Sequence, residues 1–329
     1  MDVGRGREIF KEKDQVLDIS VIIPTLNRDL YLKNTLGDLR RQEGNFSWEI
    51  IVVDQNPVPI QGRDKAFYSE TEKAGGVRWV VSPGHAVVLA RNQGVGMAKG
   101  EILVFVDDDV EIKDPHFLSK HLKAHIESGS EVAAVCGREV NAGSGEFVHR
   151  LHYRREGPLS DVLHFPRNFS QKMEAVVLST CNCSIKKKPL CDVEGFDENF
   201  GGASYGDDSD LALRLAAAGY KILYDPGPVL HHLRAPVGGL RLSTTNKGSS
   251  FSDRDKVLSS LVFYRKHVRN QRWGIKLFYI RNHILRRSIF LKANVVRPWK
   301  LVGAVVGLVQ ACLAVRRCPG RGSVSTASR

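Results

Sequence analysis

Several features that would assign a protein to a large class are missing from this 329-residue sequence. No apolar run reaches the roughly 20 residues that a helix needs to cross a bilayer, and the apolar stretch at residues 301–315 is too short. The N-terminal residues contain no apolar segment typical of a secretory signal, which favours a cytoplasmic location. No Gly-x-Gly-x-x-Gly follows the first apolar run, which disfavours a dinucleotide-dependent oxidoreductase.

Cysteine is also sparse. The six cysteines form no pair of Cys-x-x-Cys units and show no spacing with histidine typical of structural zinc. We therefore expect reduced thiols in a cytosolic compartment. Hydrophobic residues make up 42% of the chain, enough for the core of one large α/β domain or of two smaller ones.

Acidic residues are absent from the last part of the chain. Residues 256–329 hold 16 of the 48 Lys and Arg residues and no Asp or Glu. Basic residues beside aromatic and apolar ones suit a helix on an anionic membrane surface, such as the inner face of the plasma membrane. Helices packed on the main domain, with a solvated basic face, are an equal alternative. No nucleic-acid-binding motif accompanies the charge, so we expect no nucleic-acid partner.

The order of apolar runs predicts alternating strands and helices. Residues 19–24 and 49–54 have the pattern of strands, and Asn27 can cap a helix between them. Such a unit crosses over right-handedly, so Thr25 and Asp54 should lie on one edge of a parallel sheet. Strands are also expected at 77–81, 101–106 and 132–136, and helices at 86–99 and 115–128. These elements predict an α/β fold with a mostly parallel, twisted central sheet flanked by helices.

Three adjacent carboxylates, Asp107, Asp108 and Asp109, end the apolar run at residues 101–106. Like charges this close raise one another's pKa unless a cation, hydrogen-bond donors or water offset the repulsion. Ligands collect at the carboxyl ends of strands in open α/β sheets, and carboxylates there can bind Mg²⁺ or Mn²⁺. The alternative is a solvated acidic turn after a buried strand.

A second acidic cluster and a histidine pair follow about 100 residues later. Asp207, Asp208 and Asp210 occupy the first turn of a helix that Gly219 should end. Acids there can simply complement the helix dipole, or one of them can act as a general base. His231 and His232 follow a predicted strand, and either could be a metal ligand or a structural residue.

Taken in order, these segments resemble the family 2 glycosyltransferases of the GT-A fold. The resemblance covers roughly residues 18–235. Its motifs are Ser20-Val21-Ile22-Ile23-Pro24-Thr25-Leu26-Asn27-Arg28, Val52-Val53-Asp54, Ala90-Arg91-Asn92-x-Gly94, Asp107-Asp108-Asp109, Gly195-Phe196-Asp197-Glu198-Asn199-Phe200, Asp207-Asp208-x-Asp210-Leu211 and the late His.

The resemblance implies a site for a nucleoside-diphosphate sugar donor and a divalent ion, Mg²⁺ or Mn²⁺. Asp54 would accept a hydrogen bond from the base of the nucleotide. Asp107 and Asp109, the acids of a DxD element, would bind the metal together with His231 or His232. The residues implied at the nucleotide sugar are Pro24, Thr25, Asn27, Arg28, Asp54, Arg91, Asp107 and Asp108.

The resemblance also implies the reaction. Asp208 would act as general base, although the family's Glu-Asp pair is Asp207-Asp208 here, so the role could fall to Asp207. Asn182 and Asp210 would lie on the acceptor side. The implied enzyme transfers a hexosyl or deoxyhexosyl group, with inversion, to a hydroxyl of a glycan or lipid-linked acceptor. Cell-envelope or extracellular polysaccharide biosynthesis is the expected setting.

We expect the following domain organisation. Residues 1–17 form a flexible segment, and 18–240 form the GT-A catalytic domain. Within it, 18–110 bind the nucleotide sugar and 111–240 bind the acceptor. Residues 241–316 form a basic helical C-terminal region, peripheral on a membrane or packed on the domain, and 317–329 form a disordered tail.

Two other functions are weighed against this one. A sugar nucleotidyltransferase also uses an α/β sheet and acidic metal ligands, but it usually carries a Gly-rich phosphate loop, which is absent after Pro24. A non-catalytic glycan- or membrane-binding protein could use the same fold, with the basic C-terminal region as its binding surface.

Overall fold

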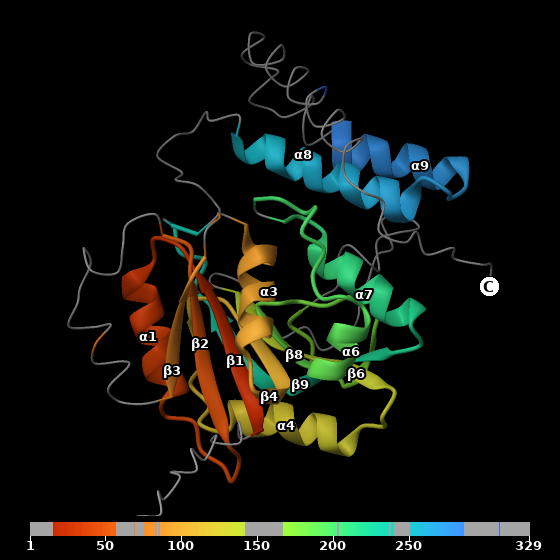
Figure 1. The fold of residues 1–329 in the computed structure, drawn as a ribbon. Coiled ribbons are helices and arrows are strands. Elements are labelled where there is room, and N and C mark those ends of the chain that lie inside the picture. Colours follow the sequence, from red (N-terminus) through yellow and green to blue (C-terminus); the bar gives the residue numbers. More distant parts are fainter. Residues whose placement is uncertain are drawn as a thin grey trace, which may run out of the picture.

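The computed structural model describes residues 16–56, 76–141, 167–239 and 251–285, except 83, 85, 203 and 237, together with residues 69 and 309. A nine-stranded sheet forms the centre of the molecule (Figure 1), in the order β3-β2-β1-β4-β8-β6-β9-β5, with β7 also paired to β9. Its strands are β1 Leu17–Thr25, β2 Trp48–Asp54, β3 Val77–Val81, β4 Gly100–Val106, β5 Val110–Glu111, β6 Val132–Asn141, β7 Met173–Ala175, β8 Asn182–Lys186 and β9 Lys221–His232.

The first four strands of this order are parallel, as the sequence predicts. β1 pairs with β2 and β4, and β2 pairs with β3. Thr25 lies opposite Asp54 in the register, so the predicted common edge is confirmed. β1, β2 and β4 are buried on both faces, which explains why they appear in the sequence as nearly continuous apolar runs.

The second half of the sheet is mixed. β8 is antiparallel to both β4 and β6, whereas β6 and β9 form a long parallel pair. The short strands β5 and β7 are antiparallel to β9. The longest pairings are therefore parallel, and the predicted α/β class with a mostly parallel central sheet is confirmed.

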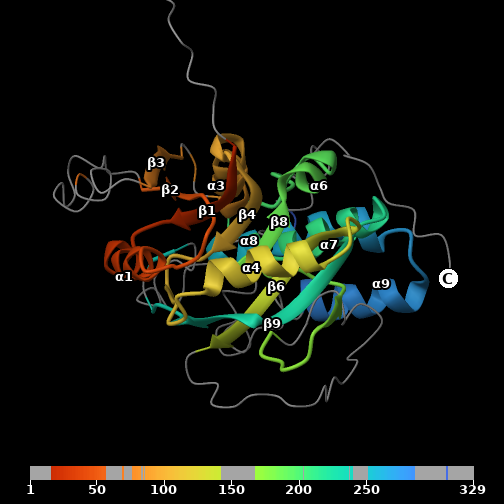
Figure 2. The same ribbon diagram turned by 90° about the horizontal axis from the view of Figure 1, so that it is seen from below.

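Helices cover both faces of the sheet (Figures 1 and 2). α1 Asp29–Leu39 and the start of α4 Phe117–Glu127 bury apolar side chains in one core cluster. α3 Val87–Met97, α6 Lys187–Asp192 and α7 Asp207–Ala217 belong to the cluster on the opposite face. Gly94 lets α3 lie directly on the sheet, because a Cβ there would meet Ile22 Cγ2 at 2.5 Å.

Two predicted helix boundaries have different outcomes. Gly219 adopts φ 87° just after α7, so its predicted role in ending that helix is confirmed. The predicted cap by Asn27 is wrong: Asn27 has φ 55°, and Arg28 takes the position that precedes α1, without a side-chain cap. The Asn27 N–H instead donates to Asn56 Oδ1 at 2.9 Å, which links the ends of β1 and β2.

The described C-terminal helices pack on the same core. They are α8 Phe251–Phe263, η2 Tyr264–Val268, α9 Trp273–Tyr279 and η3 Ile280–Leu285. Phe263 and Tyr279 are buried and stack with ring centroids 5.7 Å apart, in the cluster that includes Leu211 of α7. The described helices of the basic region therefore pack on the main domain, and the membrane-surface alternative stays a prediction.

Other expectations concern segments outside the described residues. These segments include most of the flexible N-terminal segment, the apolar stretch at 301–315 apart from residue 309, and the tail at 317–329. Among the helices that the structure does describe, none combines the length and apolar character needed to span a membrane.

Candidate active site

A cavity of about 460 Å³ opens where the carboxyl ends of β1, β4 and β9 meet the start of α7. The segment that leads into β8 completes its wall. The predicted site residues that line the cavity are Pro24, Thr25, Arg28, Arg91, Asp107, Asp108, Asp207, Asp208 and His232. Both acidic clusters and one of the two histidines therefore border a single space.

The three carboxylates after β4 have separate surroundings. Asp108 and Asp109 are buried, and both pair with Arg28, whose Nη1 lies 2.8 Å from Asp108 Oδ1 and 3.0 Å from Asp109 Oδ1. Asp108 also accepts a hydrogen bond from the Thr25 hydroxyl at 2.8 Å. Burial raises the pKa of Asp108 to about 6, against the opposing effect of Arg28. Asp107 keeps 29% of its side chain exposed and faces the cavity.

Arg28 thus explains how three adjacent acids are tolerated. The sequence alone does not identify the positive group that offsets their repulsion, and the Arg28 guanidinium, from the residue before α1, is one such group. Arg28 lines the cavity as expected, but its guanidinium is engaged by these carboxylates.

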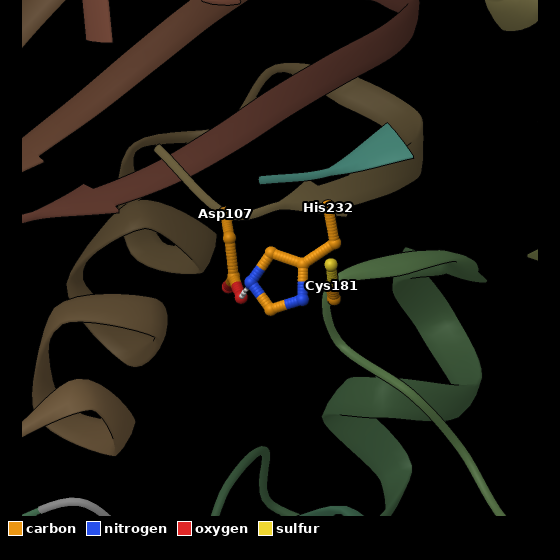
Figure 3. Close-up of side chains that lie close together, drawn as sticks. All are labelled: Asp107, Cys181 and His232. Carbon is orange, nitrogen blue, oxygen red and sulfur yellow. Dashed lines mark ion pairs between the residues drawn. The ribbon is translucent and has the colours of Figure 1, made fainter. Parts of the chain in front are cut away.

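The two adjacent histidines differ in their surroundings. His232 Nε2 lies 3.4 Å from Asp109 Oδ1 and 3.8 Å from Asp107 Oδ2. The ring lies beside the Asp107 carboxylate (Figure 3), and His232 lines the cavity. Burial alone would lower the pKa of His232, but the nearby carboxylates of Asp109 and Asp107 raise it. His231, the preceding residue of β9, is not among the residues that line the cavity.

These residues fit a divalent cation. A carboxylate oxygen of Asp107, a ring nitrogen of His232 and Sγ of Cys181 lie within 4.8 Å of one another. His232 Nε2 is buried and has no hydrogen-bond partner within the described part of the chain. Asp109 Oδ1 is instead paired with Arg28 at 3.0 Å, and its other oxygen accepts from the Ala235 N–H at 2.8 Å. Carboxylate and imidazole are ordinary ligands of such ions.

The first turn of α7 separates its two leading acids. Asp207 is buried and accepts a hydrogen bond from Arg91 Nη1 at 2.7 Å. Burial, with the nearby Asp208 carboxylate, raises the pKa of Asp207. Asp208 keeps 20% of its side chain exposed and lies 4.0 Å from the same guanidinium. Of the two candidates for the base, Asp208 is the more accessible from the cavity.

Thr180 fixes the Asp208 carboxylate. Its hydroxyl donates to Asp208 Oδ1 at 2.8 Å, and its N–H donates to Oδ2 at 3.3 Å. The resemblance extends to the stretch that begins at Cys181, which it places before the acceptor loop, but it assigns no role in the site to Cys181 or Thr180. They lie just before β8, and only the tertiary fold brings this segment to the two acidic clusters, so no local pattern could have identified them.

Several predicted residues do not line this cavity, namely Asn27, Asp54, Asp109, Asn182, Asp210 and His231. Asp54 is 2% exposed and accepts a hydrogen bond from the Asn56 N–H at 3.0 Å. Asn182 is buried and contacts His121 Nε2 at 3.0 Å. Asp210 accepts from Arg214 at 2.8 Å. The acceptor-side roles of Asn182 and Asp210 stay predictions.

Asp210 instead connects α7 with the C-terminal helices. Lys266 Nζ lies 2.6 Å from Asp210 Oδ1 and 2.6 Å from Asp197 Oδ2. His267 Nε2 lies 2.7 Å from Asp210 Oδ1. Burial would raise the pKa of Asp210, but His267, Arg214 and Lys266 together hold it well below its usual range.

A sequence model of the family described as glycosyl transferase family 2 matches residues 20–193, slightly more than half of the chain. Among curated proteins, validoxylamine A glucosyltransferase of Streptomyces hygroscopicus subsp. limoneus is 29% identical over 223 residues, covering 61% of this chain and 48% of that protein. The uncharacterized glycosyltransferase YfnE of Bacillus subtilis is 26% identical over 248 residues, covering 61% and 60%. The chain spans about half the length of the first of these relatives.

Solved structures support the fold. The mannosyltransferase PcManGT from Pyrobaculum calidifontis, in complex with GDP-Man and Mn²⁺, superposes with a TM-score of 0.53 and 20% identity, covering 91% of this chain and 76% of that chain. Residues 1–349 of S. aureus TarS, in complex with UDP-GlcNAc, give a TM-score of 0.56 and 13% identity, covering 89% and 81%. Both likenesses concern the fold alone.

Proposed function

The chain belongs to glycosyl transferase family 2, and from this premise we propose that it is an inverting hexosyl or deoxyhexosyl transferase. The donor is a nucleoside-diphosphate sugar, and the acceptor is a hydroxyl of a glycan or of a lipid-linked saccharide. One observation carries the proposal: a single cavity is bordered by the Asp208 carboxylate and by the Asp107–His232 pair.

Asp208 is proposed as the general base. A base needs an accessible carboxylate in a fixed orientation, and Thr180 orients this one while leaving it open to the cavity. Asp208 takes the proton of the acceptor hydroxyl as that oxygen attacks the anomeric carbon from the face opposite the diphosphate. Asp207 is occupied by Arg91 and is proposed to hold the start of α7 in place.

Asp107 and His232 are proposed to hold Mg²⁺ or Mn²⁺, with Asp109 and Arg28 behind them. A divalent ion there would offset the negative charge that develops on the leaving diphosphate. The Mn²⁺ in the complex of PcManGT supports this proposal by analogy of fold. Pro24 and Thr25 form the wall where the nucleotide would lie, and Asp54 stays the predicted partner of the base.

The acceptor is proposed to be met at an anionic membrane surface, in cell-envelope or extracellular polysaccharide synthesis. α9 presents Trp273 and Leu277, 73% and 61% exposed, one helical turn apart. Arg272 and Lys276 lie beside them, and we call these four residues the α9 patch. Apolar side chains flanked by cations suit the headgroup region of anionic lipids. The location at the inner face of the plasma membrane stays a prediction.

The function is tested by screening nucleotide sugars with the purified full chain and Mn²⁺. The expected result is that one donor raises the melting temperature, since a ligand that binds only the folded state stabilises it. The same donor should be hydrolysed slowly, which releases the nucleoside diphosphate. If no donor is bound or consumed with Mn²⁺ or Mg²⁺, the transferase proposal fails.

The role of Asp208 is tested with Asp208→Asn. Transfer or donor hydrolysis should fall by roughly 10²–10⁴-fold, the usual contribution of a general base, while donor-induced stabilisation persists. Asp192→Asn is the matched control, because Asp192 is an acid of α6 that pairs with Lys188 and Tyr220 outside the cavity. Near-normal turnover of folded Asp208→Asn would remove Asp208 from this role.

A further inference from the structure

The cavity contains a thiol that the proposed reaction does not use. Cys181 is 6% exposed, carries a free thiol and lines the cavity just before β8. Its Sγ, a carboxylate oxygen of Asp107 and a ring nitrogen of His232 lie within 4.8 Å of one another. Figure 3 shows the three side chains, from three separate segments, lying next to one another. The fold therefore gathers oxygen, nitrogen and sulfur donors at one place.

A second observation points independently to a bound cation. His232 is 6% exposed, and its Nε2 has no hydrogen-bond partner within the described residues. Its nearest acceptor, Asp109 Oδ1, lies 3.4 Å away, beyond the usual length of an N–H···O hydrogen bond. A metal ion is a group that would satisfy this nitrogen. The other ring nitrogen, Nδ1, lies 3.3 Å from Asn141 Oδ1, which leaves Nε2 for the ion.

The donor set also decides which ions fit. Mg²⁺ prefers an octahedron of oxygen ligands and is bound poorly by sulfur. Thiolate and imidazole favour ions of the Zn²⁺ and Co²⁺ class. Asp109, the other carboxylate within reach, is already paired with Arg28 at 3.0 Å, so the negative charge near the ion is limited.

We propose that Cys181 is a third ligand at this site and that the cavity binds thiophilic divalent ions, of the Zn²⁺ and Co²⁺ class, in preference to Mg²⁺. The proposal rests on the metal site of the proposed function and extends it to an ion class. Binding replaces the S–H bond of Cys181 by a sulfur–metal bond and releases the proton to the solvent. The ion supplies the charge that makes a buried thiolate tolerable.

The test is the absorption spectrum of the metal-free full chain during titration with Co²⁺. A Cys181 thiolate bound to Co²⁺ gives a charge-transfer band in the near ultraviolet, which carboxylate and imidazole ligands alone do not give. In the wild type, we expect the absorbance of this band to rise until one equivalent of Co²⁺ has been added. In Cys181→Ser, we expect no such band. Cys191→Ser is the control, because it removes an exposed thiol of α6 that does not line the cavity, and it should leave the band unchanged.

Competition measures the selectivity. Zn²⁺ should displace Co²⁺ at concentrations at least about 100-fold lower than Mg²⁺ requires, and Cys181→Ser should reduce this ratio at least about tenfold. The Co²⁺ spectrum of the wild type alone can refute the proposal, so the test does not depend on whether Cys181→Ser folds.

The outcomes separate this inference from the proposed function. A wild type that binds Co²⁺ without the band, or a band that persists in Cys181→Ser, overturns the role of Cys181. If donor hydrolysis with Mn²⁺ is then still observed, the transferase proposal stands without it. A band without any donor turnover under any ion would leave the thiophilic site in place and refute the transferase.

Discussion

Thr180 and Asp208 link the segment before β8 to the first turn of α7. The Thr180 hydroxyl donates to Asp208 Oδ1 at 2.8 Å, and both residues line the cavity. A carboxylate on a helix terminus could rotate toward solvent or toward Arg91. The hydroxyl holds Asp208 in one orientation, which is what proton abstraction from a bound acceptor requires.

We therefore expect Thr180→Val to lower kcat roughly tenfold with KM for the donor nearly unchanged, since a hydrogen bond to a charged group contributes about 1.5 kcal/mol. Valine keeps the size of threonine but not its hydroxyl. Thr180→Ser keeps the donor and should restore most of the activity. If both variants lose activity equally, the effect comes from packing and not from the hydroxyl.

The two adjacent histidines offer a matched pair of variants. His232 points at Asp107 and Asp109, whereas His231 does not line the cavity. His232→Ala should raise the Mn²⁺ concentration needed for half-maximal activity at least about tenfold, as expected for loss of a ligand or its neighbour. His231→Ala should leave it close to that of the wild type. EDTA should abolish activity, and added Mn²⁺ or Mg²⁺ should restore it; full activity in EDTA would contradict the metal proposal.

The sequence was sufficient to predict where the acids lie, but not what they contact. Apolar runs that end in Asp54 and Asp107 imply parallel strands with a common edge, and the register of β1 with β2 confirms this for Asp54. Arg28 pairs with Asp108 and Asp109 through a contact between residues 80 positions apart. It follows Asn27, whose φ is positive. No local pattern encodes such a contact.

For a related reason, the sequence alone could not show which of His231 and His232 faces the site. Side chains alternate across a strand, so one irregularity in register reverses which residue faces the site. β9 contains such a shift against β6, between Cys136 and Arg138. The contacts of Asp210 were equally unpredictable. Its partners Lys266 and His267 come from a helix whose position on the domain cannot be read from the sequence alone.

Lys266 is expected to hold the C-terminal helices on the domain. Its ammonium group lies 2.6 Å from both Asp197 and Asp210, and all three side chains are nearly buried. Lys266→Met would leave two buried acids short of a partner, so the free energy of unfolding should fall by roughly 3 kcal/mol in denaturant titrations. Lys188→Met, which removes an exposed pair with Asp192, should not change it measurably. Equal effects of the two variants would contradict the assignment.

Acid sensitivity should arise from a buried histidine cluster beneath β8. His121 contacts Ser184 Oγ at 2.9 Å, and burial lowers the pKa of His121 to about 4 and that of His125 to about 3. Both are neutral in the folded chain but bind protons below about pH 6.5 when unfolded. The contribution of these two histidines to the free energy of unfolding should therefore be constant above pH 7 and should fall as the pH drops from about 6.5 to 4.

The His121 contribution is measured by denaturant titrations at several pH values. His121→Gln should reduce the slope by up to about 1.4 kcal/mol per pH unit between pH 6 and 4.5, the effect of one proton. His116→Gln replaces an exposed histidine next to the same helix and should leave the slope unchanged. An identical slope in His121→Gln and the wild type would exclude His121 as the source.

The α9 patch predicts selective binding to anionic vesicles. Trp273 and Leu277 can enter the headgroup region, and Lys276 Nζ lies 5.0 Å from the centre of the Trp273 ring, so charge and apolar surface act together. In cosedimentation, the wild type should bind vesicles with anionic lipid, bind neutral ones far less, and dissociate as salt screens the charges.

The double variant Trp273→Ser/Leu277→Ser should lose most of this binding. Ile126→Ser, which removes a similarly exposed apolar side chain from α4, should keep it. If neutral vesicles bind equally well, charge has no part in docking and the membrane proposal fails.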